Sequence, residues 1–375
     1  MKMALSDDQA RFLRLRAQRL AAQQPGTVVG VVQALCGFQA QDAPAASLGV
    51  RVRSAGLAPA DVERARVEDR SVVRTWGMRG TLHLLATEDL SWLLALLGPV
   101  CIAASRRRSV ALGLDEDTYA RGVRAIRDAL ASRGPLTRPE LVEYLDSRGI
   151  RTEGQAKAYL VYRAALEGVL CLGPDRGAKP TYVLLDDWIP RGRAVSLSRE
   201  EAGAELARRY LAAYGPAGPE DMAAWSGLSI SEIRAAWRVI ADDLLEAPLA
   251  GRPAWMLKTR AAWLDELAAS SRVVRLLPAF DTYLLGYRSR DLAAPPQYAK
   301  RINAGGGMIQ PTLLVDGRVV GTWRSKRQRN GLEVVIEPFH PLAPEVMPGL
   351  EAEISDLARF LGTVAALRAL PPLAQ

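Results

Sequence analysis

The chain has 375 residues, with 49 Lys and Arg against 41 Asp and Glu, and a net charge of +8. That length exceeds one ordinary hydrophobic core, so we expect two or three domains or several similar modules. A hydrophobic share of 49% with 24% charged residues excludes a disordered chain, and the Arg-rich surplus of positive charge suits a polyanionic partner.

The first part of the chain, residues 1–115, predicts helices that begin near Asp7, Val28 and Asp61 and a β-hairpin through residues 74–83. This order of helices followed by a hairpin is looser here than in the two segments that follow. We interpret it as the first of several related units because the same order recurs along the chain.

Two glutamines, Gln39 and Gln41, follow an apolar run at residues 28–38. In an extended or bent segment both amides would point the same way, since side chains alternate along a strand. Two carboxamides aimed at one point can hold a water or a sugar oxygen with donors and acceptors together. The alternative is a polar helix end, where the amides satisfy backbone groups.

The second segment, residues 116–195, predicts two helices and a β-hairpin. Capping-box patterns open both helices, Thr-x-x-Glu at 137–140 and Thr-x-x-Gln at 152–155. Strands at 169–172 and 181–185 then flank a turn. This is the pattern of a winged helix.

The third segment, residues 196–270, repeats the pattern. A short helix ends near Trp225, and a capping box at 229–232 opens the next helix. Strands at 244–246 and 254–257 would form its wing. The repetition of three similar units is stronger evidence for the predicted fold than any single copy is.

After residue 271 the pattern of predicted elements changes from helices with a wing to strands and hairpin turns. A strand at 273–277 is followed by a hairpin whose turn is Asp316-Gly317, and Asn330-Gly331 marks a second turn. We therefore expect an α+β fold: three tandem winged-helix motifs, the first with the Gln-x-Gln motif, and a C-terminal mixed β domain at 271–375 with hairpins.

Few residues suit redox or metal chemistry. Cys36, Cys101 and Cys171 have no CxxC spacing and predict reduced core thiols in a cytoplasmic protein. His83 and His340 are the only histidines, so we expect no metal, no cofactor and no His-based relay.

Membrane insertion is not expected either. No positively charged stretch followed by a long apolar run opens the chain. The apolar stretch 90–104 contains Gly98-Pro99 and precedes three arginines, so it predicts a buried helix.

Several of these residues also make the chain resemble a known family, the AlkZ/YcaQ family of winged-helix DNA glycosylases. The matching residues occur in family order over nearly the whole chain: Gln39-Ala40-Gln41, Arg74-Thr75-Trp76, Met78 to His83, Phe280-Asp281 and Val320 to Trp323.

The resemblance implies tandem winged helices and a β-domain that form a C-shaped, concave basic surface around duplex DNA. It implies a monofunctional glycosylase of base excision repair that hydrolyses the N-glycosidic bond of bulky N7-alkylpurine adducts, including interstrand crosslinks, without flipping the base. The Gln-x-Gln branch of the family is associated with self-resistance to DNA-alkylating natural products.

The chemistry agrees with the residue types. N7 alkylation makes guanine cationic and a good leaving group, so the enzyme needs a positioned water and dipoles that favour an oxocarbenium ion. The carboxamides of Gln39 and Gln41 can orient such a water, although they cannot act as strong bases. Asp42 is the rival, provided that the chain bends there. A lyase step needs an amine, and Lys2 is the only lysine before Lys157.

Two groups of basic residues are candidates for phosphate contact. Arg74 and Arg79 lie in the first predicted wing, where they could equally be solvated strand charges. A denser cluster beside the second C-terminal turn consists of Arg324, Lys326, Arg327 and Arg329.

Further residues are candidates for support of the site: His83, Asp281, Tyr287 and Arg288. Structural roles are the alternative for each. We expect a cytoplasmic monomer, associated with the nucleoid through duplex DNA that carries alkylated purines. The second hypothesis is a non-catalytic winged-helix DNA-binding regulator, which would bind DNA but leave no abasic sites.

Overall fold

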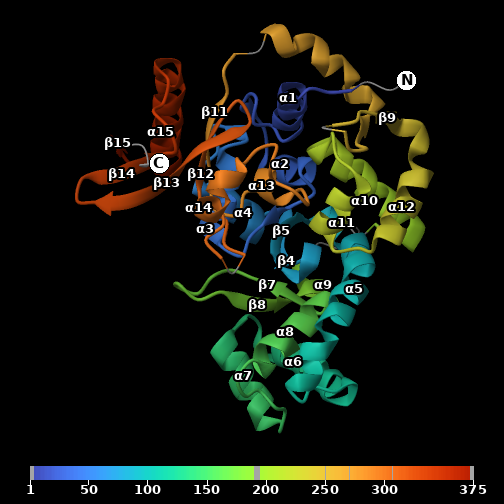
Figure 1. Ribbon diagram of the computed structural model, residues 1–375. Helices are drawn as coiled ribbons and strands as arrows, with labels where there is room; N and C mark the ends of the chain where they lie inside the picture. Colours follow the sequence, from blue (N-terminus) through green and yellow to red (C-terminus); the bar gives the residue numbers. More distant parts are fainter. Residues whose placement is uncertain (1–3, 190–194, 250, 270, 306, 372–375) are drawn as a thin grey trace. The chain divides into compact units, whose positions relative to one another are not determined.

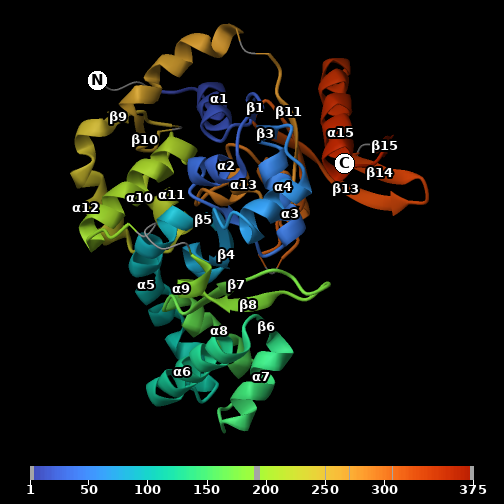
Figure 2. The ribbon, with the colours of Figure 1, turned by 180° about the vertical axis from the view of Figure 1, so that it is seen from behind.

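The computed structural model describes residues 4–189, 195–249, 251–269, 271–305 and 307–371 (Figures 1 and 2). The chain divides into two compact units. Unit 1 comprises Met1–Val62, Ala204–Trp225 and Ser229–Gln375, and unit 2 comprises Glu63–Gly203 and Ser226–Leu228. Both contain helices and strands, which agrees with the expected α+β class. The expected four domains and the number of winged helices stay predictions.

Unit 2 is built on a sheet in which the strand order is β5-β4-β7-β8-β6. Its strands are β4 (Val72–Trp76), β5 (Leu82–Ala86), β6 (Leu136–Thr137), β7 (Leu170–Leu172) and β8 (Thr181–Leu184). Its helices are α5 (Leu90–Ala111), α6 (Glu116–Arg133), α7 (Arg138–Ser147), α8 (Ala156–Leu166) and α9 (Leu185–Trp188), with short 3-10 turns η1 (Met78–Gly80) and η2 (Thr87–Asp89).

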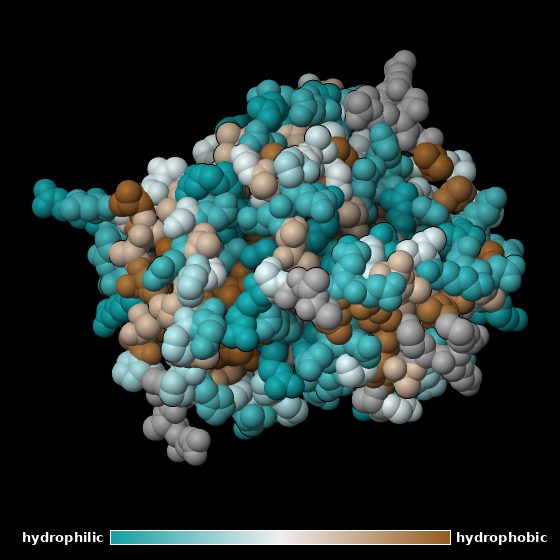
Figure 3. Space-filling model, turned by 90° about the horizontal axis from the view of Figure 1, so that it is seen from above, coloured by the Kyte–Doolittle hydropathy of each residue, from teal (hydrophilic) through white to brown (hydrophobic). Residues whose placement is uncertain are grey.

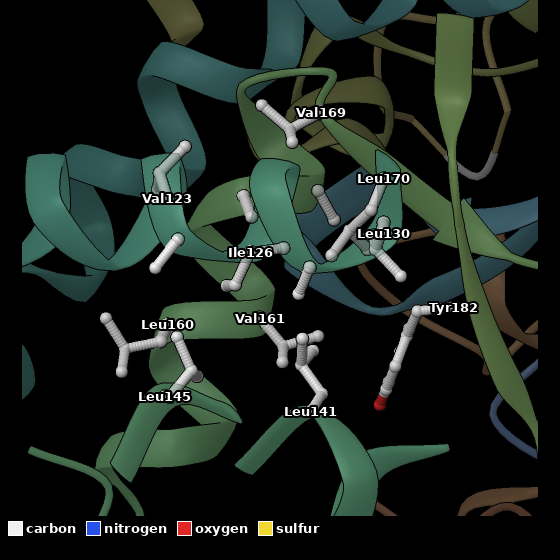
Figure 4. Close-up of a cluster of buried hydrophobic side chains, with 14 of the residues drawn as sticks. Val123, Ile126, Leu130, Leu141, Leu145, Leu160, Val161, Val169, Leu170 and Tyr182 are labelled. Carbon is white, nitrogen blue, oxygen red and sulfur yellow. The ribbon is translucent and has the colours of Figure 1, made fainter. Parts of the chain in front are cut away.

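The second predicted segment has the expected order of helices and hairpin. Thr137 and Glu140 form the predicted capping box at the start of α7. Figure 4 shows apolar side chains of α6, α7 and α8 pointing toward one another, with Leu170 and Tyr182 from the strands at the edge of this core. Ile126, Leu141 and Leu160 are fully buried there, so each of the three helices turns an apolar face toward this core.

The capping box predicted at residues 152–155 is wrong. The Thr152 hydroxyl donates to the Asp146 carboxylate instead, and α8 begins only at Ala156. The Gln155 amide oxygen accepts hydrogen bonds from Arg108 at 2.8 and 3.1 Å. Both side chains of the predicted cap therefore bind residues outside α8: Thr152 binds Asp146, and Gln155 binds Arg108.

The apolar stretch after residue 90 forms α5. The segment Thr87–Ala111 is long and apolar enough to cross a membrane, but 56% of its apolar window is buried inside the protein. Gly98 packs so closely on α8 that an added Cβ would lie 2.6 Å from the Leu166 carbonyl oxygen. These contacts fit the predicted buried helix.

Unit 1 holds the N-terminal helices and the C-terminal sheet. Its helices are α1 (Asp7–Ala17), α2 (Val28–Ala34), α3 (Ala43–Arg51), α12 (Ile230–Val239), α13 (Thr282–Leu285), α14 (Ala299–Ile302) and α15 (Met347–Leu361). Three helices carry residues of both units: α4 (Pro59–Val67), α10 (Arg199–Tyr214) and α11 (Pro219–Ser226). The 3-10 segments are η3 (Ala241–Asp243), η4 (Lys258–Ala269), η5 (Pro296–Tyr298) and η6 (Pro344–Val346).

The strands of unit 1 form the short pairs β1-β3 and β9-β10 and one five-stranded sheet of order β11-β12-β13-β14-β15, and β2 is a further two-residue strand. They are β1 (Gln24–Pro25), β2 (Phe38–Gln39), β3 (Ser54–Ala55), β9 (Leu244–Glu246), β10 (Trp255–Leu257), β11 (Val274–Leu277), β12 (Thr312–Val315), β13 (Arg318–Gln328), β14 (Gly331–Pro338) and β15 (Ala365–Ala369).

Several predicted elements of unit 1 are confirmed. Ser229 and Glu232 form the capping box of α12, and β9 pairs with β10 in antiparallel orientation. Asp316 and Gly317 turn between β12 and β13 with φ of 48° and 80°, as an Asp-Gly hairpin turn requires. Figure 1 shows α15 and β15 beside the hairpin of β13 and β14.

The surface seen from above mixes hydrophilic residues with small, separate hydrophobic patches (Figure 3). Such scattered apolar residues are normal for a globular protein and do not by themselves mark a binding face.

Candidate active site and nucleic-acid interface

The glutamine pair lies in an extended segment. After α2 the chain turns through Cys36 and Gly37, which have φ of 54° and 104°, and then enters β2. Phe38 and Ala40 are buried, whereas Gln39 is half-buried and Gln41 is exposed. This alternation places both glutamines on the less buried side of the segment, as the i, i+2 spacing predicted. Gln39 lies in β2 and Gln41 directly precedes Asp42, the N-cap of α3, so the helix-end alternative remains open for Gln41.

Asp42, the rival of the pair, begins the next helix. Its Oδ1 accepts a hydrogen bond from the Ala45 backbone N–H at 3.0 Å, which makes it the N-cap of α3. Pro44 in the first turn also favours a helix that starts here. A structural role therefore accounts for Asp42.

Phe38 anchors the segment of Gln39 to Gln41 from its buried side. Its side chain is 2% exposed, and an added Cβ on Gly49 of α3 would come within 3.1 Å of its ring. The Arg53 guanidinium lies 5.3 Å from the centre of the same ring. Glycine at position 49 thus permits the close packing that holds the residue before Gln39.

Arg53 forms a buried ion pair with Asp281, one of the predicted support residues. Two guanidinium nitrogens donate to the carboxylate at 2.7 and 2.8 Å, and both side chains have 0% exposure. Arg53 also donates to the carbonyl oxygens of Gln18 and Gly49. Asp281 therefore supports the glutamine segment indirectly, through Arg53 and Phe38.

Tyr287 reaches the segment through a second tyrosine. Its hydroxyl donates to the Tyr214 carbonyl oxygen at 3.0 Å, and the Tyr214 hydroxyl donates to the Leu35 carbonyl oxygen at 3.1 Å. Burial raises the pKa of Tyr287 to about 12, so its hydroxyl stays protonated at neutral pH. Arg288 is exposed, and its backbone N–H donates to Asp221.

In unit 2, His83 is buried and neutral. Burial lowers its pKa from 6.5 to about 4, and its Nδ1 lies 2.9 Å from the Thr81 carbonyl oxygen. A carbonyl can only accept, so Nδ1 carries the proton. These contacts match the structural alternative for His83, and a neutral imidazole cannot contact phosphate as a cation.

The first hairpin presents its two arginines differently. Arg79 is exposed in the turn η1 with φ of 55°, whereas Arg74 in β4 is half-buried. The exposure of Arg79 fits the predicted phosphate contact better than the position of Arg74 does. Both assignments stay predictions.

The second basic group lies on the arm formed by β13 and β14. Arg324, Lys326, Arg327 and Arg329 are all exposed, which a contact with phosphate requires, and that contact stays a prediction. Arg324 donates to Glu337 at 3.1 Å, and Lys326 stands opposite Glu333 in the strand register. Part of the positive charge is therefore balanced within the arm, while the side chains remain accessible to a partner.

Comparison with known proteins places this chain in a family. A family model described as DNA glycosylase AlkZ-like matches residues 32–360, which contain both glutamines. The chain belongs to the AlkZ-like DNA glycosylases. This confirms the resemblance seen in the sequence and the prediction of an enzyme.

A curated protein and a solved structure, both from Streptomyces sahachiroi, are similar to this glycosylase. An "Interstrand DNA cross-link repair glycosylase" is 32% identical over 363 residues, which are 93% of this chain and 95% of that protein. The solved structure of DNA glycosylase AlkZ matches with a TM-score of 0.83 and 29% identity, over 98% of this chain and 100% of that one. The match supports the mixed α+β fold.

Sequence reasoning missed the residues that position the glutamines of the glycosylase. Neither Arg53 nor Tyr214 stands in a recognisable motif, and each acts across a long separation in sequence. Within the described part of the chain, no group of three His, Cys, Asp or Glu side chains could hold a metal ion. What remains at the candidate site is polar and uncharged, suited to orienting a water.

Proposed function

We propose that the glycosylase hydrolyses the N-glycosidic bond of bulky N7-alkylpurine adducts in duplex DNA, with a water held by Gln39 and Gln41. The observation that carries this proposal is the extended segment with both glutamines on its less buried side, backed by Phe38. The relative named for interstrand cross-link repair supports a bulky or crosslinked substrate.

The proposed chemistry starts from the charge of the lesion. An N7-alkylated purine is cationic, so it leaves without a strong general acid, and positive charge develops on the deoxyribose. The carboxamide oxygens of Gln39 and Gln41 accept hydrogen bonds from a water and orient its lone pair toward C1′. The purine leaves as a neutral N7-alkylpurine with the bonding electron pair, water adds to C1′ and releases its surplus proton to the solvent, and the product is an abasic site.

The cellular setting forms part of the same proposal. We place the protein in the cytoplasm, on the nucleoid, as a monomer that gives self-resistance to a DNA-alkylating natural product. Three tandem winged helices in a C-shaped arrangement would offer duplex DNA a basic concave surface. The surplus of eight positive charges supports a polyanionic partner.

The test uses duplex DNA with defined N7-guanine adducts of several sizes, and abasic sites are measured by cleavage with heat or base. Gln39→Ala and Gln41→Ala should each slow excision about 100-fold, or about 3 kcal/mol, while DNA affinity stays nearly unchanged. The double variant should cost less than the sum of the two, because one water is shared.

Two further variants sharpen the test. Gln297→Ala removes an exposed glutamine elsewhere and should leave the rate unchanged. Gln41→Asp should retain activity, since the other branch of the family carries a carboxylate there. If Gln39→Ala and Gln41→Ala both melt like the parent and excise at the parental rate, the proposed role is wrong, and Asp42 becomes the next residue to test.

A further inference from the structure

Unit 1 contains a cavity of about 830 Å³ that the glutamine segment does not use. It is lined by α1, the end of α2, α10 and η4. Four arginine side chains line it, and we call it the arginine pocket: Arg16, Arg19, Arg209 and Arg260. A volume of several hundred Å³ is typical of sites that bind small ligands.

The charges of the arginine pocket are only partly balanced. Arg16 pairs with Glu266, and Arg209 pairs with Glu205 at 2.7 Å. Among the residues that the structure describes, no carboxylate lies within ion-pair distance of Arg19 or Arg260. In the described part of the chain, the guanidinium groups of Arg19 and Arg260 therefore have no ion-pair partner.

The hydrogen bonds of these two arginines are also incomplete. The Nε of Arg19 and the Nε of Arg260 are buried and have no hydrogen-bond partner within the described chain. Burial, and then repulsion from Arg16, lowers the pKa of Arg260. A buried donor without a partner is costly, and an anion against the part of each side chain that lines the cavity would offset that cost.

The ring of Trp263 packs against two of the arginine side chains that line the arginine pocket. The guanidinium groups of Arg16 and Arg260 lie 4.8 and 4.3 Å from the centre of its ring. Contact with the face of an aromatic ring does not use the N–H groups, so the ring leaves the donors of Arg260 available to a ligand, whereas Arg16 already pairs with Glu266. The aromatic surface thus holds the cations in place and is not itself free for stacking.

We propose that the arginine pocket is a phosphate-binding site, separate from the site of base excision. Arginine forks match phosphate oxygens, and Arg19 and Arg260 supply the unbalanced positive charge. The phosphate comes either from the backbone of bound DNA or from a free phosphorylated ligand. Asp265, which is exposed and also lines the pocket, limits the affinity for an anion.

The test removes the two unpaired charges with Arg19→Gln and Arg260→Gln together. Arg238→Gln with Arg252→Gln is the matched control, because both of these arginines are exposed and lie in the same unit. Inorganic pyrophosphate binding is measured by titration calorimetry. Binding to undamaged duplex DNA is measured by fluorescence anisotropy over a series of salt concentrations.

We expect pyrophosphate binding to weaken about tenfold or more in the pocket variant and to stay unchanged in the control. If the natural source is DNA, the slope of log affinity against log salt should also fall by about 1, as for the loss of one phosphate contact. If the source is a free ligand, only pyrophosphate binding changes.

The substitution Asp265→Asn gives an independent check, since it removes a negative charge and should strengthen pyrophosphate binding severalfold. The proposal is overturned if the parent binds no pyrophosphate, or if the pocket variant and its control behave alike in both assays. None of these measurements uses excision, so they stand apart from the test of Gln39 and Gln41.

Discussion

The ion pair between Arg53 and Asp281 gives a sharp stability prediction. Asp281→Asn removes the charge that balances a guanidinium with 0% exposure and turns an amide N–H₂ group toward it. Breaking a buried pair from one side typically costs about 3–5 kcal/mol. For domains of about 150–250 residues each kcal/mol lowers Tm by about 2–4 °C, so we expect a fall of about 6–20 °C.

The matched control is Asp243→Asn in the same unit. Asp243 pairs with Arg208 at 2.9 Å, but both side chains are nearly half exposed, so this loss should stay below about 1 kcal/mol. Calorimetry at fixed pH and salt measures both variants. A melting temperature of Asp281→Asn within about 2 °C of the parent, together with lost excision, would refute the structural role and return Asp281 to the site.

The remaining predictions concern DNA affinity and pH. Log affinity for undamaged duplex DNA should fall steeply with log salt, and binding should be largely independent of sequence; a flat response would contradict electrostatic binding. Lys326→Ala with Arg327→Ala should weaken DNA binding without lowering Tm. The same change at the exposed Lys300 and Arg301 should weaken DNA binding less. Equal losses of DNA affinity would show that the arm is not part of the DNA interface. Burial lowers the pKa of His83 to about 4, whereas in the unfolded state it is about 6.5. As pH falls from about 6.5 to 4, the unfolded state therefore binds a proton that the folded state does not, and about 3 kcal/mol of folding stability should be lost. His83→Gln should remove that loss and His340→Gln should keep it, as measured by denaturant titration at each pH.

Local patterns predicted local structure well. The capping boxes of α7 and α12 and the turn at Asp316-Gly317 involve neighbours in sequence, and all three were correct. The extended form of Gln39 to Gln41 was one of the two alternatives that the sequence left open. In these places the interactions that fix the backbone lie within a few residues of one another.

Tertiary contacts explain what the sequence could not show. Arg53 and Asp281 are 228 positions apart, and Tyr214 and Leu35 are 179 apart, so no local pattern announces either contact. Helix α3 was not predicted from the sequence, although Asp42 followed by Pro44 is a typical start of a helix. The failed cap at Thr152 shows the same effect, since a nearby carboxylate outcompeted the backbone for its hydroxyl.

The arm of β13 and β14 has a consequence for solubility. β12 pairs with β13 only as far as Thr322, so within the described chain the outer edge of β13 from Arg324 to Gln328 has no strand partner. An open edge invites a strand from a second molecule, and charged side chains along it oppose such association. Variants that strip the arm of charge to probe DNA contact should therefore also aggregate more readily. The basic residues of the arm thus protect the free protein from aggregation, whatever they do when DNA is bound.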